Sequence, residues 1–407
     1  MKAPRPALVV VLAGISAALH VGKLPPALPV LQQELGVTLL QAGFLLSLVQ
    51  LAGVALGLAM GAAADALGPR RTMVLGLVLL SVAGFLGGLA TTPAVLLALR
   101  GCEGAGFLLA TLPAPALIRQ LVEPARLGAM LGVWGAYMPL GTAAALLLGP
   151  VAIVATGWPG WWWLIATLSL LMAGWLWLAV PAACDERLAA AAAVGRGRIA
   201  RTVRAGAPWL IGLGFAAYSA QWLAVVGFLP TIYAQSGLPA VYVAPATALV
   251  AAVNMVGNIA AGRLLQRGVV PPALLQAGYL AMALGAILAF APWSASASME
   301  VVAARYAGVL LFSMVGGLVP ATMFWLAVRL APDEGTVSTT VGWVQQWSSL
   351  GQFVGPPLAA LLAARSGDWS RTWWLTGGLA AGGLLVATLI GRRLRGRNGA
   401  PPGAPPS

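Results

Sequence analysis

The chain has 407 residues, of which 60% are hydrophobic and only 8% are charged, and its formal net charge is +13 at pH 7. A soluble globular domain carries about 25% charged residues, so this chain has too few polar groups to cover its own surface in water. The composition therefore excludes an ordinary soluble protein and indicates a chain whose outer surface mostly faces lipid.

Apolar segments recur along the whole chain, and each has the roughly 20 residues that a helix needs to cross a bilayer. Because only a helix or a closed barrel satisfies its own backbone inside lipid, such segments are expected to be helices. The sequence thus predicts an all-α, polytopic membrane protein with twelve transmembrane helices. The predicted spans begin near residues 7, 42, 72, 94, 127, 161, 208, 242, 271, 300, 337 and 372.

Positive charge is distributed unevenly between the predicted loops. If Met1 is cytoplasmic, nearly all Lys and Arg residues outside the spans are also cytoplasmic, whereas the opposite side holds Arg365 and Arg371. Cytoplasmic loops of membrane proteins are enriched in Lys and Arg, so both termini are expected on the cytoplasmic side. The membrane is expected to be the cell inner membrane. The net charge is then a topology signal, and no nucleic-acid partner is expected.

The first span contains two unusual residues, His20 and Lys23, inside an apolar run from residue 7 to residue 31. Three prolines follow Lys23, so a bend is predicted there. The ammonium has two possible positions: it snorkels outward, or it turns into a cavity beside His20, three residues away on the same face. We favour the inward position, because a cation beside His20 disfavours a second proton until an anion binds, which would couple solute to proton uptake.

The stretch "GAAADALGPRR", residues 61 to 71, follows the second span and resembles the signature that major facilitator superfamily transporters place between their second and third helices. Ala66 stands where that family usually has Arg. In the second half, "GRLLQRG", residues 262 to 268, has Gln266 in place of the acid. The residues that match the family pattern in the two stretches are Gly61, Asp65, Gly68, Arg70, Arg71, Gly262 and Arg267.

The resemblance implies that these residues form a conformational gate. Asp65 would accept hydrogen bonds from helix N-termini, or from an arginine across the seam between the halves, and so hold one conformation. The alternative is that Asp65 is a turn residue that balances the charges of Arg70 and Arg71.

A second match lies on the fourth span, where "RGCEGAG", residues 100 to 106, is similar to the family's fourth-helix pattern. Arg100 and Glu103 are three residues apart on one helix face and are expected to pair. Glu103 is the only carboxylate predicted within a span, so Lys23 and Arg305 are expected to remain uncompensated.

Internal repeats divide the chain into two halves. "LPVLQQELG" at 28 and "LPTIYAQSG" at 229 align at an offset of 201 (229 − 28 = 201), and the offset grows only between spans. Two parallel six-helix repeats are the architecture of a transporter whose halves rock around a central site. The prediction is two pseudo-symmetric six-helix bundles at 1–183 and 207–395, an Arg-rich cytoplasmic linker at 184–206 and a disordered tail at 396–407.

The resemblance implies a cavity lined by helices one, four, seven and ten, where Arg100 and Arg305 occupy equivalent places in the two repeats. Two guanidinium groups in such positions suit a planar anion. The alternative is that each arginine only snorkels to the interface. The predicted solute-binding residues are His20, Lys23, Arg100, Arg305, Tyr137, Gln221, Trp222 and Trp347, and the predicted proton-coupling residues are His20 and Glu103.

A glycine pattern on the eleventh span resembles an antiporter signature of the same family: Gly342, Gly351 and a Gly-Pro pair at 355 and 356. The family places that signature on helix five, where this chain has only a partial match. We therefore interpret the glycines as sites of close helix packing.

Together these features predict a secondary transporter that moves a small anionic solute by alternating access, with protons as the coupling ion. Stretches such as "GFLPTIYAQSG" also resemble the branch that carries cyanate and nitroimidazole-type solutes. The alternatives are an efflux pump for hydrophobic compounds and a membrane receptor or scaffold that does not transport. The sequence predicts no enzyme activity, cofactor or metal, and its expected partners are the solute, the lipid bilayer and protons, with the chain as a monomer.

Overall fold

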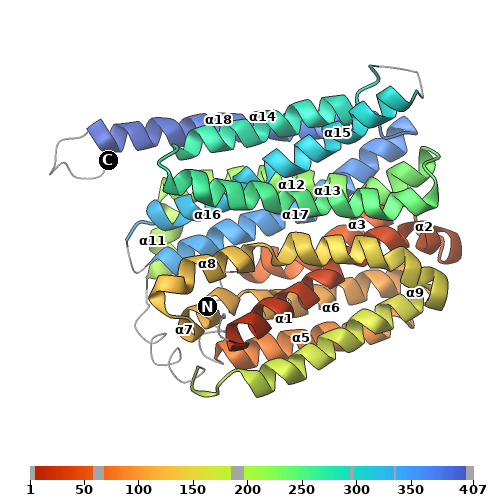
Figure 1. The fold of residues 1–407 in the computed structure, drawn as a ribbon, viewed down its shortest axis with the longest axis horizontal. Coiled ribbons are helices and arrows are strands. Elements are labelled where there is room, and N and C mark those ends of the chain that lie inside the picture. The colour runs from red at the N-terminus through yellow and green to blue at the C-terminus, as the bar shows by residue number, and fades with distance from the viewer. Residues whose placement is uncertain (1–4, 58–67, 185–196, 294–297, 334–335, 400–407) are drawn as a thin grey trace.

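The computed structural model describes residues 5–57, 68–184, 197–293, 298–333 and 336–399. Within these ranges every regular element is a helix, as the composition predicted (Figure 1). The start of the first described helix, at Arg5, and the end of the last, at Gly399, lie toward the same end of the bundle in Figure 1, as an even number of spans requires.

The first half of the chain begins with one long apolar segment that is broken at Lys23 into α1 and α2. The third helix passes through a single 3₁₀ turn, η1, before it continues to residue 57. The elements are α1 (Arg5–Gly22), α2 (Leu24–Glu34), α3 (Leu39–Ser47), η1 (Leu48–Gln50), α5 (Pro69–Gly87), α6 (Pro93–Thr111), α7 (Ala114–Leu121), α8 (Pro124–Gly135) and α9 (Tyr137–Ala179).

The second half repeats long apolar helices after a short helix, α11, in the predicted linker. An ion pair of 3.0 Å between Arg201 Nε and Asp333 Oδ2 joins this linker helix to the segment before α17. The elements are α11 (Arg198–Arg204), α12 (Gly206–Gln235), α13 (Ala240–Gln266), α14 (Pro271–Phe290), α15 (Met299–Gly316), α16 (Leu318–Arg329), α17 (Val337–Ser366) and α18 (Thr372–Gly399).

Ten segments of the described residues are long and apolar enough to cross a membrane. One of them, Val133–Ala179, has 47 residues, more than twice the length that one span needs. It turns back at Gly157, whose φ of 71° favours glycine, so it forms two spans (Figure 1). The 30-residue α17 is less apolar than these segments but long enough to cross a membrane. The ten segments, one of which forms two spans, together with α17 account for the twelve predicted spans.

The most extensive contacts between the two halves are α3 with α17, α9 with α13, and α2 with α12. At one end, an apolar cluster of buried residues includes Leu28 and Leu46 from the first half and Phe228 and Ala360 from the second. This end also holds α2 and the turn at Gly157. The halves are therefore closed over each other at the end that the charge pattern predicts to be outside.

Glycines let the helices approach closely, as the pattern on the eleventh span predicted. A Cβ atom added to Gly351 or Gly355 of α17 would collide with the carbonyl oxygens of Ala216 and Ala220 on α12. A Cβ at Gly43 of α3 would lie 2.8 Å from the Cα of Pro357, which belongs to the other half. The interpretation of these glycines as packing positions is confirmed.

The domain limits stay a prediction. Residues 185–196 of the predicted linker and residues 400–407 of the predicted tail lie outside the described residues. Between residues 396 and 399, which were predicted to be disordered, α18 continues as a helix to Gly399.

Candidate functional site

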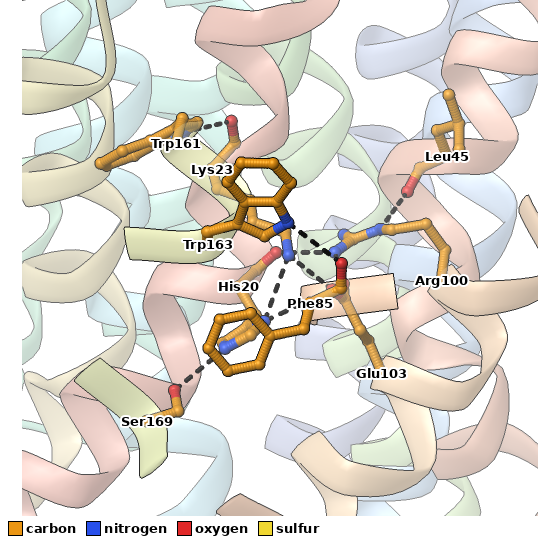
Figure 2. A network of polar contacts seen from close by, with 9 residues as sticks. All are labelled: His20, Lys23, Leu45, Phe85, Arg100, Glu103, Trp161, Trp163 and Ser169. Carbon is orange, nitrogen blue, oxygen red and sulfur yellow. Dashed lines mark hydrogen bonds and ion pairs between the residues drawn. The ribbon is translucent and has the colours of Figure 1, made fainter. Parts of the chain in front are cut away.

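Four ionisable side chains meet inside the first half of the molecule: His20, Lys23, Arg100 and Glu103, here called the charged cluster (Figure 2). They come from α1, from the residue between α1 and α2, and from α6. Each has at most 1% of its surface exposed. An ionisable group in the membrane is costly unless it faces partners that satisfy it, so such a cluster is a candidate functional site.

The local sequence explains how Lys23 reaches this position. The helix α1 ends at Gly22, and Lys23 is the N-cap residue of α2, which starts with two prolines near its N-terminus. The backbone N–H of Lys23 still donates to Leu19 O at 2.8 Å, while its carbonyl accepts from Trp161 Nε1 at 3.0 Å. The break predicted after Lys23 is therefore present, and both backbone groups of Lys23 are satisfied.

Glu103 is the centre of the charged cluster. Lys23 Nζ donates to Glu103 Oε1 at 2.5 Å, and Arg100 Nη1 forms an ion pair with Glu103 Oε2. Lys23 Nζ also lies 3.3 Å from His20 Nδ1 and 4.7 Å from the ring centre of Trp162. The expected pairing of Arg100 with Glu103 and the inward position of Lys23 beside His20 are both observed.

One expectation is wrong: Lys23 is not uncompensated. The sequence places Lys23 and Glu103 80 residues apart, so their contact depends on how α1 packs beside α6. Both cations share the single carboxylate of Glu103. With Lys23 and Arg100 charged and His20 neutral, the charged cluster still carries one surplus positive charge.

Arg100 also ties the charged cluster to the seam between the halves. Its guanidinium donates to the carbonyl oxygen of His20 at 2.7 Å and to that of Leu45 on α3 at 3.0 Å. Its Nη2 atom is buried and has no hydrogen-bond partner among the residues that the structure describes. The next residue on α3, Leu46, contacts α12 at Gly227, where an added Cβ would lie 3.0 Å from Leu46.

Two serines extend the charged cluster on the other side of His20. His20 Nε2 lies 3.0 Å from Ser169 Oγ on α9, and Ser169 Oγ lies 3.0 Å from Ser16 Oγ on α1. Both serines are buried. Sequence reasoning missed them, because nothing in the local pattern of α9 distinguishes Ser169 from any other small residue on a packed helix.

Arg305 lies apart from the charged cluster. Its Nη1 donates to Ala289 O at 3.0 Å, and its guanidinium lies 5.4 Å from the ring centre of Trp293. Arg305 belongs to the second turn of α15, and its side chain is half-buried against the end of α14. These contacts of Arg305 have no partner in common with the contacts of Arg100 described above, and the clamp between the two arginines stays a prediction.

The other predicted solute-binding residues are dispersed. Gln221 Nε2 donates to its own helix at Ala217 O, and its buried Oε1 has no partner. Trp222 Nε1 donates to Ser313 Oγ at 3.3 Å. Tyr137 stacks on Trp134 with ring centres 4.4 Å apart, in the first half of the molecule.

Trp347 borders a small pocket of about 120 Å³ at the seam between the halves, which is also lined by Val54, Trp343, Gln346 and Leu350. Trp343 Nε1 and Gln346 Oε1 are buried without a hydrogen-bond partner. The lining is aromatic and uncharged, so this pocket differs in chemistry from the charged cluster.

A neutral hydrogen-bond network crosses the seam beside this pocket. Gln50 Nε2 donates to Gln352 Oε1 at 3.0 Å, and Gln346 Nε2 donates to Val54 O at 2.6 Å. Gln50 and Gln352 are both buried. Sequence reasoning did not select these glutamines, although Gln50 interrupts the apolar third helix and ends its 3₁₀ turn, a feature that often marks a hinge.

The predicted gate is only partly visible. Gly61 and Asp65 lie outside the described residues. Gly68 precedes α5 with a φ of 89°, and Arg70 stacks 3.9 Å from the ring centre of Trp177 and donates to its carbonyl oxygen. Arg71 and Arg267 of the predicted gate are exposed. At Gly262, no atom of a neighbouring described element lies within 4 Å of an added Cβ.

Comparison with known proteins gives a family and a fold. The family model described as Major Facilitator Superfamily matches residues 7–347. The solved structure of a bacterial homologue of the human lysosomal transporter Spinster, in an inward-facing and occupied conformation, is similar with a TM-score of 0.75 at 15% identity, covering 99% of this chain and 100% of that one. Its inward-facing, unoccupied form has a TM-score of 0.70 at 15% identity, covering 95% and 94%.

A relative with a named activity matches a shorter region. The puromycin resistance protein pur8 of Streptomyces alboniger is 35% identical over 147 residues, which is 36% of this chain and 29% of that protein. The matched region thus spans less than a third of that relative.

Proposed function

Since the chain belongs to the major facilitator superfamily, we propose that it is a proton-coupled secondary transporter whose coupling centre is the charged cluster of His20, Lys23, Arg100 and Glu103. The family and fold make the chain a multi-pass membrane transporter rather than an enzyme. The proposal adds the coupling ion, the residues that carry it and the class of solute.

The observation that carries the proposal is the charge balance of the buried cluster. Two cations share one carboxylate, and all three side chains are at most 1% exposed. Burying a charge without a full partner costs several kcal/mol, whereas a paired set is far less costly. Arg cannot lose its proton in a protein, so Lys23 is the group whose deprotonation leaves a neutral Arg100–Glu103 pair.

Arg100 supplies a route from the charged cluster to the moving halves. Its hydrogen bond to Leu45 O holds α3, which packs on α17 of the second half. A ligand or proton shifts a conformational equilibrium only by interacting differently with the two states. A change of charge at Lys23 alters its electrostatic interaction with Glu103, which is also paired with Arg100. Because Arg100 donates to Leu45 O, this change acts on α3 at the seam.

A small anion is the solute class that the surplus positive charge favours. The buried Nη2 of Arg100 has no partner, and a guanidinium donates well to planar oxyanions. The charged state of Lys23 would then bind the anion and the neutral state would release it, which makes proton and anion move together. The shared grip with Arg305 stays a prediction.

Export of an aromatic compound is a second candidate. The pocket at the seam is lined by Trp343, Trp347 and Gln346, and among the described residues Trp343 Nε1 and Gln346 Oε1 are buried without a hydrogen-bond partner. The relative whose name refers to puromycin resistance adds weight to this candidate.

The test uses proteoliposomes with an imposed pH gradient and a panel of radiolabelled small organic and inorganic anions, with puromycin as the aromatic probe. We expect one or more anions to accumulate with the gradient. Glu103→Gln is expected to abolish accumulation while exchange of labelled for unlabelled anion continues without a gradient. Glu300→Gln makes the same chemical change at an exposed position in the first turn of α15 and serves as the control.

Two results would contradict the proposal. Accumulation that is independent of the pH gradient, or unchanged in Glu103→Gln, would remove the charged cluster from coupling. Movement of puromycin without movement of any anion would favour the second candidate, and failure of every probe to move would favour the receptor alternative.

A further inference from the structure

We propose that Ser169 and Ser16 form a proton relay that connects Lys23, through His20, to Ser16, which lies one turn of α1 closer to its N-terminus than His20. The inference rests on the proposed function, because it assigns a path to the proton that the charged cluster exchanges. Neither serine takes part in the interactions that balance the charge of Glu103.

The relay is a continuous line of polar atoms across α1 and α9. Lys23 Nζ lies 3.3 Å from His20 Nδ1, His20 Nε2 lies 3.0 Å from Ser169 Oγ, and Ser169 Oγ lies 3.0 Å from Ser16 Oγ. Figure 2 shows the imidazole between the ammonium and Ser169, with one ring nitrogen facing each. Lys23, His20 and Ser169 are 0% exposed and Ser16 is 2% exposed, so water reaches the line of contacts only at Ser16.

The charge of Lys23 sets the direction of these hydrogen bonds. An ammonium only donates, so Nδ1 of the neutral imidazole accepts and Nε2 carries the ring proton. Nε2 then donates to Ser169 Oγ, which leaves the Ser169 hydroxyl free to donate to Ser16 Oγ. Every proton in the line therefore points from Lys23 toward Ser16.

The transfer step follows from that order. Lys23 gives a proton to His20 Nδ1, His20 gives its Nε2 proton to Ser169 Oγ, Ser169 gives its own proton to Ser16 Oγ, and Ser16 gives its proton to water. One proton enters water and Lys23 becomes a neutral amine. The imidazole ends with its proton on Nδ1 instead of Nε2, and both serines end as hydroxyls.

The groups that face His20 favour this step over storage of a proton on the ring. Lys23 and Arg100 are cations, and Glu103 Oε1 lies 3.5 Å from Nδ1 but is already shared with Lys23. From α5, Gly84 approaches the ring edge, where an added Cβ would lie 3.3 Å from Cε1, and α9 presents Ser169. Two adjacent cations disfavour an imidazolium, so His20 passes the proton on.

The experiment uses the fact that His20 is the only histidine of the chain. Full-length protein labelled with ¹⁵N-histidine in lipid nanodiscs gives one imidazole in its NMR spectrum, and the two nitrogen shifts identify the tautomer. We expect the Nε2–H tautomer at neutral pH and the Nδ1–H tautomer at alkaline pH, with line shapes that report the rate of interconversion.

In Ser169→Ala we expect this interconversion to slow by about a hundredfold, the lower end of what a positioned proton-transfer group contributes. Ser169→Thr retains a hydroxyl and is expected to restore the rate. Ser47→Ala removes another buried serine, whose hydroxyl donates to Phe44 O of its own helix, and is expected to leave the rate unchanged.

An unchanged rate in Ser169→Ala would overturn the relay, and so would a wild-type imidazole that keeps one tautomer at both pH values. Neither result decides whether the transporter is coupled to protons, because gradient-driven accumulation and its loss in Glu103→Gln are measured separately. Intact coupling with an unchanged rate would mean that the charged cluster exchanges its proton by another path.

Discussion

The two halves of the molecule share a helical scaffold but differ in the polar groups that they bury. In the first half, α1 and α6 bring together the charged side chains of His20, Lys23, Arg100 and Glu103. In the second half, Tyr218 and Asn254 form a neutral network with α15: Asn254 Nδ2 donates to Tyr218 Oη at 2.9 Å and to the carbonyl oxygen of a serine at 2.8 Å.

The repeat alignment makes this difference specific. Gln221 stands where the first half has His20, and Arg305 stands where it has Arg100. The Arg305 side chain, however, lies beside Trp293, which follows the end of α14. Alternating access needs two halves that pack alike, whereas proton coupling needs an ionisable site in only one of them. Under the proposed function, proton exchange would therefore belong to the first half, while the buried network of Tyr218 and Asn254 in the second half is neutral.

The largest effect is expected from removal of the shared carboxylate. Glu103→Ala leaves Lys23 and Arg100 buried without their counter-ion, and removal of one partner of a buried ion pair typically costs about 3–5 kcal/mol. Denaturant unfolding in mixed micelles would measure this loss. Glu300→Ala, at an exposed position, is the control, and equal stability of the two variants would contradict the charge balance described for the cluster.

Removal of a side chain from the neutral network of the second half is expected to reduce the free energy of unfolding by less than Glu103→Ala does. Asn254→Ala removes the donor to the buried Tyr218 Oη, whereas Ser313 O keeps its hydrogen bond from the Gly317 N–H, and the expected cost is about 1–3 kcal/mol. The same unfolding assay applies. A loss as large as that of Glu103→Ala would show that the two halves do not differ in the way that their charges indicate.

Loss of one hydrogen bond at the seam between the halves is expected to change the free energy by less than either of the two substitutions above. Gln50→Leu removes the hydrogen bond to Gln352, and one neutral hydrogen bond contributes about 0.5–1.5 kcal/mol, or a shift of a few-fold in the populations of two conformations. Disulfide crosslinking of cysteine pairs placed across α3 and α17 would report those populations. Unchanged crosslinking would exclude the Gln50–Gln352 contact from the conformational change.

The smallest effect concerns Asp368, in the turn between α17 and α18. Hydrogen bonds from the Ser370 hydroxyl and backbone N–H lower the pKa of this carboxyl below its ordinary value of 3.8. A lowered pKa in the folded state stabilises the fold above the unfolded pKa, and this contribution is lost as the pH falls through the folded pKa. Ser370→Ala is therefore expected to reduce stability slightly at neutral pH and not at strongly acidic pH, in unfolding measurements across that range. A decrease that is equally large at acidic pH would contradict the assignment.

Much of the fold was predictable because membrane helices obey simple rules. The twelve spans follow from length and hydropathy, and the break at Lys23 follows from the prolines after it. The packing role of Gly351 and Gly355 followed from their spacing. The pairing of Arg100 with Glu103 and the approach of Lys23 to His20 were predictable because each pair is separated by three residues of one chain segment.

The sequence by itself determined the membrane helices, the two repeats and the local pairs of charged residues, because these depend on composition and on neighbours within one or two turns. Only the tertiary structure decided that both pairs meet at Glu103, that Ser169 lies beside His20 from 149 residues away, and that Arg305 stays apart from Arg100. Contacts between helices depend on which faces pack together and at what height along the bilayer. A hydropathy pattern predicts that a helix spans the membrane, but it contains no information on these two quantities.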